Sequence, residues 1–213
     1  MRITHYLYCE MKNVCSIFSL VFFLPAVALG LFDWSTTNID TRVRVQAPAR
    51  LVIVNMSNAA ALSSASESVK KEALKKSKTT KYFMAKGTDY VYSILRVDGG
   101  ASGMPESIAT NPKSLKEFYD GFANVITRED RGQVISSKPF ITSGMEGRDI
   151  KYLGIHVFTG KKVIKYSRTL LVGNICYLMR FVSLDPLDST GVSGHGERAR
   201  FFNSIAVKPT PAK

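Results

Sequence analysis

The sequence KVIKYSRTLLV-GN-ICYLMRFV, which runs from Lys162 to Val182, decides the fold. Two alternating apolar stretches are separated here by only two residues, Gly173 and Asn174. A two-residue loop that contains glycine is typical of a β-hairpin with a tight primed turn. The length of the loop also fixes the register of the strands, so we expect Leu170 to face Tyr177.

The two faces of this hairpin differ in polarity. One face is apolar with a single exception, Arg168, which we expect opposite Met179. The other face mixes apolar residues with polar ones such as Ser167 and Arg180, which is typical of a partly covered face. We therefore expect the hairpin at the centre of a sheet, with helices packed against its apolar face.

The periodicity of the remaining chain predicts an α+β protein. Strands are expected at Thr41–Gln46, Leu51–Asn55, Lys81–Lys86, Asp89–Val97, Gln133–Ile141 and Arg148–Phe158. Helices are expected at Ser57–Lys78, Pro112–Thr127 and Gly196–Val207. These elements predict a single α+β domain over residues 41–208, followed by a disordered tail at residues 209–213.

Two capping and turn signals support these elements. Asn111 can cap the second helix and Pro112 suits its first position. Gly87 and Thr88 separate two of the strands, and glycine in the first loop position predicts a second primed turn.

The amino-terminal residues have the layout of a secretory signal peptide. Lys12 precedes an apolar run from Val14 to Leu24, and Ala26 and Ala28 form the small-residue pattern of a cleavage site. This pattern predicts an exported protein, periplasmic or secreted.

We place the signal peptide at residues 1–28, with Met11 as an alternative start, and a leader at residues 29–40. The alternative is an uncleaved anchor in the inner membrane, because Leu29, Leu31 and Phe32 prolong the apolar run.

The net charge of +12 indicates an acidic partner, or simply a soluble basic protein. The lysines are densest between residues 70 and 81, and the candidates for weak anion or partner binding are Lys70, Lys71, Lys75 and Lys76. The alternative is the solvated face of a surface helix. Peripheral contact with a membrane fits this cluster, whereas nucleic acid does not, because no aromatic or Arg residues are interleaved.

The nucleophilic and metal-ligating residues do not form a recognisable site. Cys176 is the one cysteine after residue 28, so we expect no internal disulfide and a small buried side chain. His156 has no ligand partner at metal-binding spacing, which predicts a structural or solvent-facing role, no metal and no cofactor. Ser193 and His195 resemble a displaced nucleophile elbow, but no strand leads into them, and we interpret Ser193 as a helix N-cap.

Arg168 is the residue that breaks the hydrophobic pattern of the hairpin. A buried guanidinium needs partners, and Asp149 or Glu146 can supply them as an ion pair. The alternative is that Arg168 anchors a small anionic ligand.

The second half of the chain carries residues that together resemble a known group of proteins. They are Gly147, Arg148, Asp149, Leu171–Asn174, Tyr177, Phe201, Phe202, Ser204 and Ile205. Over Phe118–Val207 the chain is similar to small exported bacterial proteins of unassigned role, whose fold is similar to that of the photosystem PsbP subunit and the Ran-release Mog protein. The resemblance implies an α-β-α sandwich with a mainly antiparallel sheet, and it provides no catalytic residues.

From these observations we expect a non-enzymatic, exported accessory protein that binds a partner protein or an envelope component. Two alternatives remain from other classes. One is a binding protein for a small anionic ligand that uses Arg168, and the other is a hydrolase that uses Ser193 and His195.

Overall fold

The structure is a computed structural model that describes residues 34–54, 78–156, 160–185 and 187–208. Its strands are β1 (Ser35–Asn38), β2 (Val43–Ala47), β3 (Val52–Val54), β4 (Thr80–Lys86), β5 (Tyr90–Asp98), β6 (Gln133–Thr142), β7 (Met145–Ile155), β8 (Lys162–Val172), β9 (Ile175–Ser183) and β10 (Ala206–Val207). Its helices are α4 (Pro112–Glu129) and α5 (His195–Asn203), and two short 3-10 turns lie at Gly100–Ser102 and Glu106–Ile108. No helix within these residues is long and apolar enough to cross a membrane.

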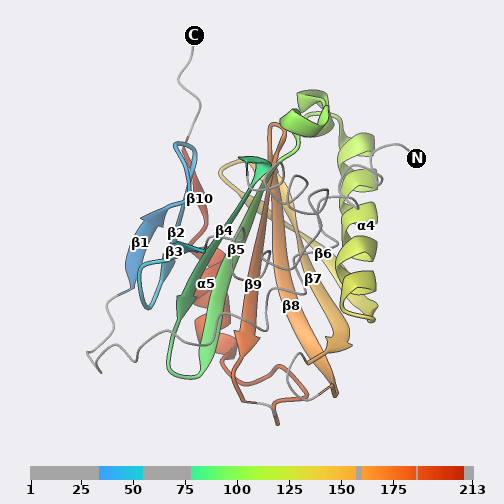
Figure 1. Ribbon diagram of the computed structural model, residues 1–213. Coiled ribbons are helices and arrows are strands. Elements are labelled where there is room, and N and C mark those ends of the chain that lie inside the picture. Colours follow the sequence, from blue (N-terminus) through green and yellow to red (C-terminus); the bar gives the residue numbers. More distant parts are fainter. Residues whose placement is uncertain (1–33, 55–77, 157–159, 186, 209–213) are drawn as a thin grey trace, which may run out of the picture.

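Seven strands form one antiparallel sheet in the order β3-β4-β5-β9-β8-β7-β6, and β1, β2 and β10 form a small second sheet (Figure 1). The β8–β9 hairpin lies inside the large sheet, and Leu170 pairs with Tyr177 as the sequence predicted. Gly173 has φ +62°, which suits the first loop position of a type II′ turn. The predicted register and turn of the hairpin are therefore confirmed.

The large sheet is covered on both faces. Helix α4 lies on one face, and α5 lies on the other beside the small sheet (Figure 1). Each interface buries its own hydrophobic cluster, one built around Phe118 and Phe122 of α4 and the other around Phe201 and Phe202 of α5. The predicted α+β sandwich is confirmed by this arrangement.

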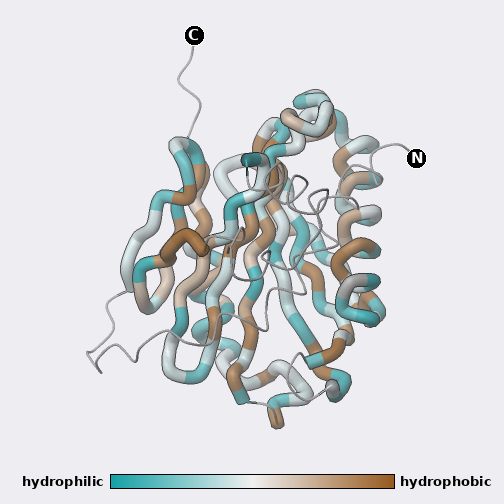
Figure 2. The backbone as a smooth tube through the Cα atoms, viewed as in Figure 1, coloured by the Kyte–Doolittle hydropathy of each residue, from teal (hydrophilic) through white to brown (hydrophobic). Residues whose placement is uncertain are grey.

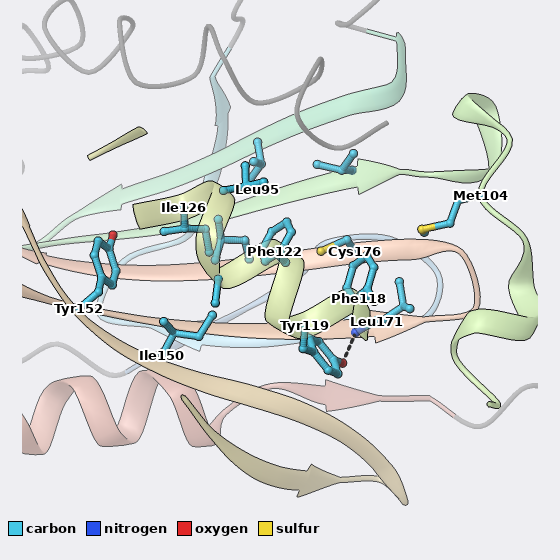
Figure 3. Close-up of a cluster of buried hydrophobic side chains, with 14 of the residues drawn as sticks. Leu95, Met104, Phe118, Tyr119, Phe122, Ile126, Ile150, Tyr152, Leu171 and Cys176 are labelled. Atoms are coloured by element: carbon cyan, nitrogen blue, oxygen red, sulfur yellow. Dashed lines mark hydrogen bonds between the residues drawn. The ribbon is translucent and has the colours of Figure 1, made fainter. Parts of the chain in front are cut away.

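Helix α4 begins where its capping residues predict. The Asn111 side chain accepts a hydrogen bond from the Ser114 amide at 3.0 Å, and Pro112 is the first helical residue. Phe118, Phe122 and Ile126 follow at helical spacing and point into the cluster shown in Figure 3. This apolar stripe fixes the helix on the sheet.

The hydroxyl of Tyr119 links α4 to two strands. It accepts from the Leu171 amide at 3.0 Å, as Figure 3 shows. It also donates to the Glu146 carbonyl at 2.8 Å. Because Tyr119 is fully buried, Tyr119→Phe would leave both backbone groups without this partner. We expect a loss of about 1–3 kcal/mol in the free energy of unfolding, measured by urea denaturation.

The matched control for this prediction is Tyr166→Phe. The Tyr166 side chain is partly buried, and its hydroxyl makes no hydrogen bond among the described residues. This variant should stay within about 0.5 kcal/mol of the parent. Equal stability of the two variants would contradict the bridging role of Tyr119.

The predicted leader over residues 29–40 is wrong for its last residues. Ser35–Asn38 form β1, which pairs with β2. The strand has no apolar alternation, and the residue that it buries is Thr37, whose hydroxyl accepts from the Leu51 amide at 3.1 Å. A polar strand of this kind gives no hydrophobic signal in the sequence.

The predicted primed turn at Gly87 is also wrong. Lys86 pairs with Val91, so four residues connect the strands, and Gly87 does not have a positive φ. The physical reason is Tyr90, which pairs with β9 rather than β4, while its ring stacks on Phe181 with centroids 4.6 Å apart.

The predicted closing helix ends earlier than Val207. Helix α5 stops at Asn203, and residues 206–207 form β10, which pairs with β2. The Ser204 hydroxyl accepts from the Gln46 amide at 2.8 Å, and this bond to β2 redirects the chain at the end of the helix. The predicted signal peptide, the four candidate lysines and most of the predicted Ser57–Lys78 helix lie outside the described residues.

Candidate functional site

Arg168 lies on β8, on the face of the sheet that α5 covers, and is 8% exposed. Its Nε and Nη2 donate to the two carboxylate oxygens of Asp149 at 2.6 and 2.7 Å. Its Nη1 donates to Asn203 Oδ1 of α5 at 3.0 Å. The partner predicted from the sequence, Asp149, is therefore present, and the pair is bidentate.

Two aromatic rings complete the surroundings of this guanidinium. Arg168 Cζ lies 4.1 Å from the ring centroid of Phe140 and 5.4 Å from that of Phe202. The Asp149 carboxylate, the Asn203 amide and the two rings all contact the Arg168 guanidinium, which therefore connects β6, β7, β8 and α5. These contacts favour the structural interpretation of Arg168 over that of a ligand anchor.

Ser193 and His195 are not arranged as a nucleophile and a base. The Ser193 hydroxyl lies 3.1 Å from the hydroxyl of Tyr90, and no hydrogen bond joins Ser193 to His195 in the described part of the chain. The N-cap position of α5 belongs to Gly194, which has φ +70°, and not to Ser193 as predicted. The Ser193 hydroxyl contacts Tyr90 instead of capping the helix, and residue 194 has to be glycine, because its φ is positive and a Cβ there would lie 2.4 Å from the Tyr90 ring.

A small hollow lies beside Ser193, between the ends of β8 and β9 and the loop that leads into α5. Its lining includes His156, Tyr166, Asp188, Ser193 and Arg198. The hollow measures about 30 Å³, and since one water needs about 10–15 Å³ of such space, it has room for about two waters.

The polar groups of the hollow are partly satisfied by the protein itself. Arg198 Nη1 donates to the Gly191 carbonyl at 2.6 Å, and the guanidinium stacks on Tyr166 at 3.6 Å. Asp188 Oδ2 is buried and has no hydrogen-bond partner among the described residues. Burial lowers the pKa of His156 below its ordinary 6.5, and the positive charge of Lys165 also lowers this pKa. The negative charge of Asp185 acts in the opposite direction. Together these groups can hold ordered water.

Asp40 forms a second charged centre, which the sequence did not predict. Its Oδ1 accepts from the amides of Arg42 and Val43 at 2.8 and 2.9 Å. Its Oδ2 accepts from Arg96 Nε at 2.8 Å and from the Tyr177 hydroxyl at 2.5 Å. This carboxylate therefore ties the turn before β2 to strands β5 and β9 of the large sheet.

The contacts of Asp40 determine its charge. Burial alone would raise the pKa of Asp40, but hydrogen bonds from Tyr177, Arg96 and the two amides outweigh it and hold the pKa below the ordinary 3.8. The carboxylate is therefore ionised at neutral pH. The only sequence signal was an Asp two residues before Arg42, which is typical of an Asx turn.

Reactive cysteine and metal chemistry find no support in the described residues. Cys176 is buried in the cluster under α4, and burial raises the pKa of its thiol, so the thiol stays protonated. This confirms the interpretation of Cys176 as a buried apolar side chain. No group of three or more His, Cys, Asp or Glu side chains in the described part of the chain can hold a metal ion.

Basic residues are concentrated in one part of the chain. Residues 41–88 contain ten Lys or Arg and two Glu, so this segment carries most of the net charge of +12. Within it, Arg50, Lys81 and Lys86 are described and exposed. Lys70, Lys71, Lys75 and Lys76 belong to the same segment in sequence and lie outside the described residues.

Comparison with known proteins identifies the fold. No protein-family model and no curated protein sequence matches the chain. Ten solved chains match in structure, and one of them is the solution structure of cyanobacterial PsbP (CyanoP) from Synechocystis sp. PCC 6803. It superposes with a TM-score of 0.52 at 10% sequence identity, and the match covers 87% of this chain and 99% of that chain. The protein therefore has a PsbP-like fold, as the resemblance of its second half implied.

Proposed function

We propose that this protein is an exported, non-enzymatic accessory protein that binds a partner through its basic segment, residues 41–88. The partner is an acidic protein or an anionic component of the cell envelope. The observation that carries the proposal is the concentration of ten basic residues against two acidic ones in this segment. Charge collected in one part of a chain promotes association with an oppositely charged surface.

Two further observations support this proposal. The PsbP-like fold is the one that the resemblance to small exported bacterial proteins of unassigned role implied. Three charged side chains that lie elsewhere and are buried or half-buried, Arg168, Arg198 and Asp40, are engaged in contacts that hold the fold together. The basic segment, by contrast, includes the exposed side chains Arg50, Lys81 and Lys86.

The proposal is tested by removing four of the charges. We expect the variant Lys70→Gln, Lys71→Gln, Lys75→Gln, Lys76→Gln to lose retention on phosphatidylglycerol vesicles and on a polyglutamate resin at low salt. Since a lysine near an anionic surface contributes about 1 kcal/mol, the loss should be on the order of 100-fold or more. Retention of the parent should fall as salt rises towards physiological strength.

The control removes four exposed charges elsewhere, at Lys113, Lys138, Lys161 and Lys162. The control variant has the same net charge as the test variant and should keep most of the retention. Preference for vesicles over polyglutamate would identify an envelope component, and the reverse an acidic protein. Equal loss in the two variants would show that only total charge matters and would overturn the proposal.

A further inference from the structure

The two edges of the large sheet are formed by β6, which has ten residues, and β3, which has three, and they are protected in different ways. Lys138 and Pro139 lie within β6, and its pairing with β7 shifts at a bulge between Val134 and Ser136. A charge, a proline and a bulge are the features with which proteins prevent another strand from pairing with an edge.

The β3 edge has none of these features. Val52 is 50% exposed and Ile53 is 62% exposed, although successive side chains of a strand lie on opposite faces. Among the described residues the edge is therefore exposed on both faces, and Figure 2 shows it as a continuous hydrophobic segment. Beyond its ladder with β4, β3 makes no backbone hydrogen bond to the described residues.

We propose that β3 accepts an extended, acidic segment of a partner protein, which adds to the sheet as a further strand. This inference rests on the proposed function and names the place and the mode of binding. Main-chain hydrogen bonds to the free edge provide the affinity, and apolar side chains of the added strand cover Val52 and Ile53.

The charges around the edge determine the chemistry of the partner. Arg50 precedes β3 by two residues, while Lys81 and Lys86 belong to the paired strand β4. All three are exposed, and residues 41–54 and 78–88 contain no Asp or Glu. An added strand therefore finds apolar neighbours at its centre and cations around it.

A second copy of the chain is the less suitable occupant. Each copy carries a net charge of +12, so two identical edges repel one another. An acidic segment, by contrast, is attracted by the same positive charge.

The probe for this test is the labelled peptide EEVTVEE, whose binding is followed by fluorescence anisotropy at low salt. The test variant is Val52→Asn, Ile53→Asn, and the control is Ile135→Asn, Ile141→Asn on the protected edge, where both residues are also more than half exposed. We expect the test variant to weaken binding at least tenfold, and the control variant less than twofold.

A second peptide separates strand addition from charge attraction. EEPTPEE has the same charge but cannot donate a full set of strand hydrogen bonds, so we expect it to bind at least tenfold more weakly. Equal binding of the two peptides would overturn the strand proposal and leave the proposed function intact. Concentration-dependent dimerisation that Val52→Asn, Ile53→Asn abolishes would assign the edge to a second copy and would also overturn it.

Discussion

Asp40→Asn should lower the free energy of unfolding by about 3 kcal/mol at pH 7, as measured by urea denaturation. The substitution removes the charge that accepts from Arg96 and Tyr177, both of which are largely buried. A hydrogen bond to a charged group contributes about 1.5–3 kcal/mol, and an arginine that loses its carboxylate adds a desolvation cost. The turn before β2 would then lose its attachment to the large sheet.

The effect of this substitution should depend on pH. The folded-state pKa of Asp40 lies below the ordinary 3.8. A carboxyl whose pKa is lowered by folding stabilises the protein above the unfolded-state pKa, and this stabilisation is lost as the pH falls through the folded-state pKa. The difference between parent and Asp40→Asn should therefore be largest near neutral pH and shrink below about pH 4.

The control for this prediction is Asp98→Asn. Asp98 lies 3.8 Å from the same arginine, but its side chain is more exposed than that of Asp40. A loss below about 1 kcal/mol is expected for a pair of this kind. A pH-independent loss for Asp40→Asn, or equal losses at both positions, would contradict the central role of Asp40.

The elements that could be predicted are those whose signals are local. The β8–β9 hairpin is specified by a two-residue loop between alternating stretches, and α4 by a capping residue followed by a regular apolar stripe. Strands β1 and β10 could not be predicted, because they are polar or very short and exist only through their pairing with β2.

The same distinction explains which charged centre was predicted. Arg168 interrupts an apolar face, and its partner Asp149 lies 19 residues away on the adjacent strand, so pattern and proximity identified both. Asp40 lies 56 residues from Arg96 and 137 from Tyr177. Nothing in the local pattern relates these three residues, since the packing of the small sheet against the large one brings them together.

The position of α5 illustrates the limit of periodicity in a short helix. A helical period over Gly196–Val207 puts Ala199, Phe202 and Ile205 on one face, and of these Phe202 and Ile205 are buried. The helix also buries Arg198 and Phe201, which this period does not select. Arg198 is accommodated because it stacks on Tyr166 and donates to a loop carbonyl. A buried arginine contradicts the hydrophobic pattern, so periodicity alone could not identify Arg198 as a buried residue.

Arg168→Met should lower the free energy of unfolding by about 2–3 kcal/mol. The substitution leaves Asp149 without its bidentate partner and Asn203 without its donor. Breaking a buried pair from one side costs about 3–5 kcal/mol, and the Asp149 side chain, which is 38% exposed, is partly rehydrated by water. Arg168→Lys should also lower the free energy of unfolding, by about 1–2 kcal/mol. Lysine keeps the charge but cannot make the bidentate contact with Asp149 or the contacts with the two aromatic rings.

A double substitution distinguishes an ion pair from simple packing. In Arg168→Met with Asp149→Leu no charge is left without its partner, so we expect stability within about 1 kcal/mol of the parent. The coupling between the two positions should therefore be favourable by at least about 1 kcal/mol in a double-mutant cycle. Additive losses would show that Arg168 and Asp149 act independently.

The same variants decide between the structural role of Arg168 and that of a ligand anchor. If Arg168 only holds β7, β8 and α5 together, phosphate or sulfate should raise the unfolding temperature of the parent and of the double variant by the same amount. A ligand anchor would instead make the parent more responsive to these anions than the double variant, although the two are equally stable without them. Because both proteins are folded, a selective response of the parent would show directly that the guanidinium can exchange Asp149 for an external anion, and it would revive the alternative of a small anionic ligand.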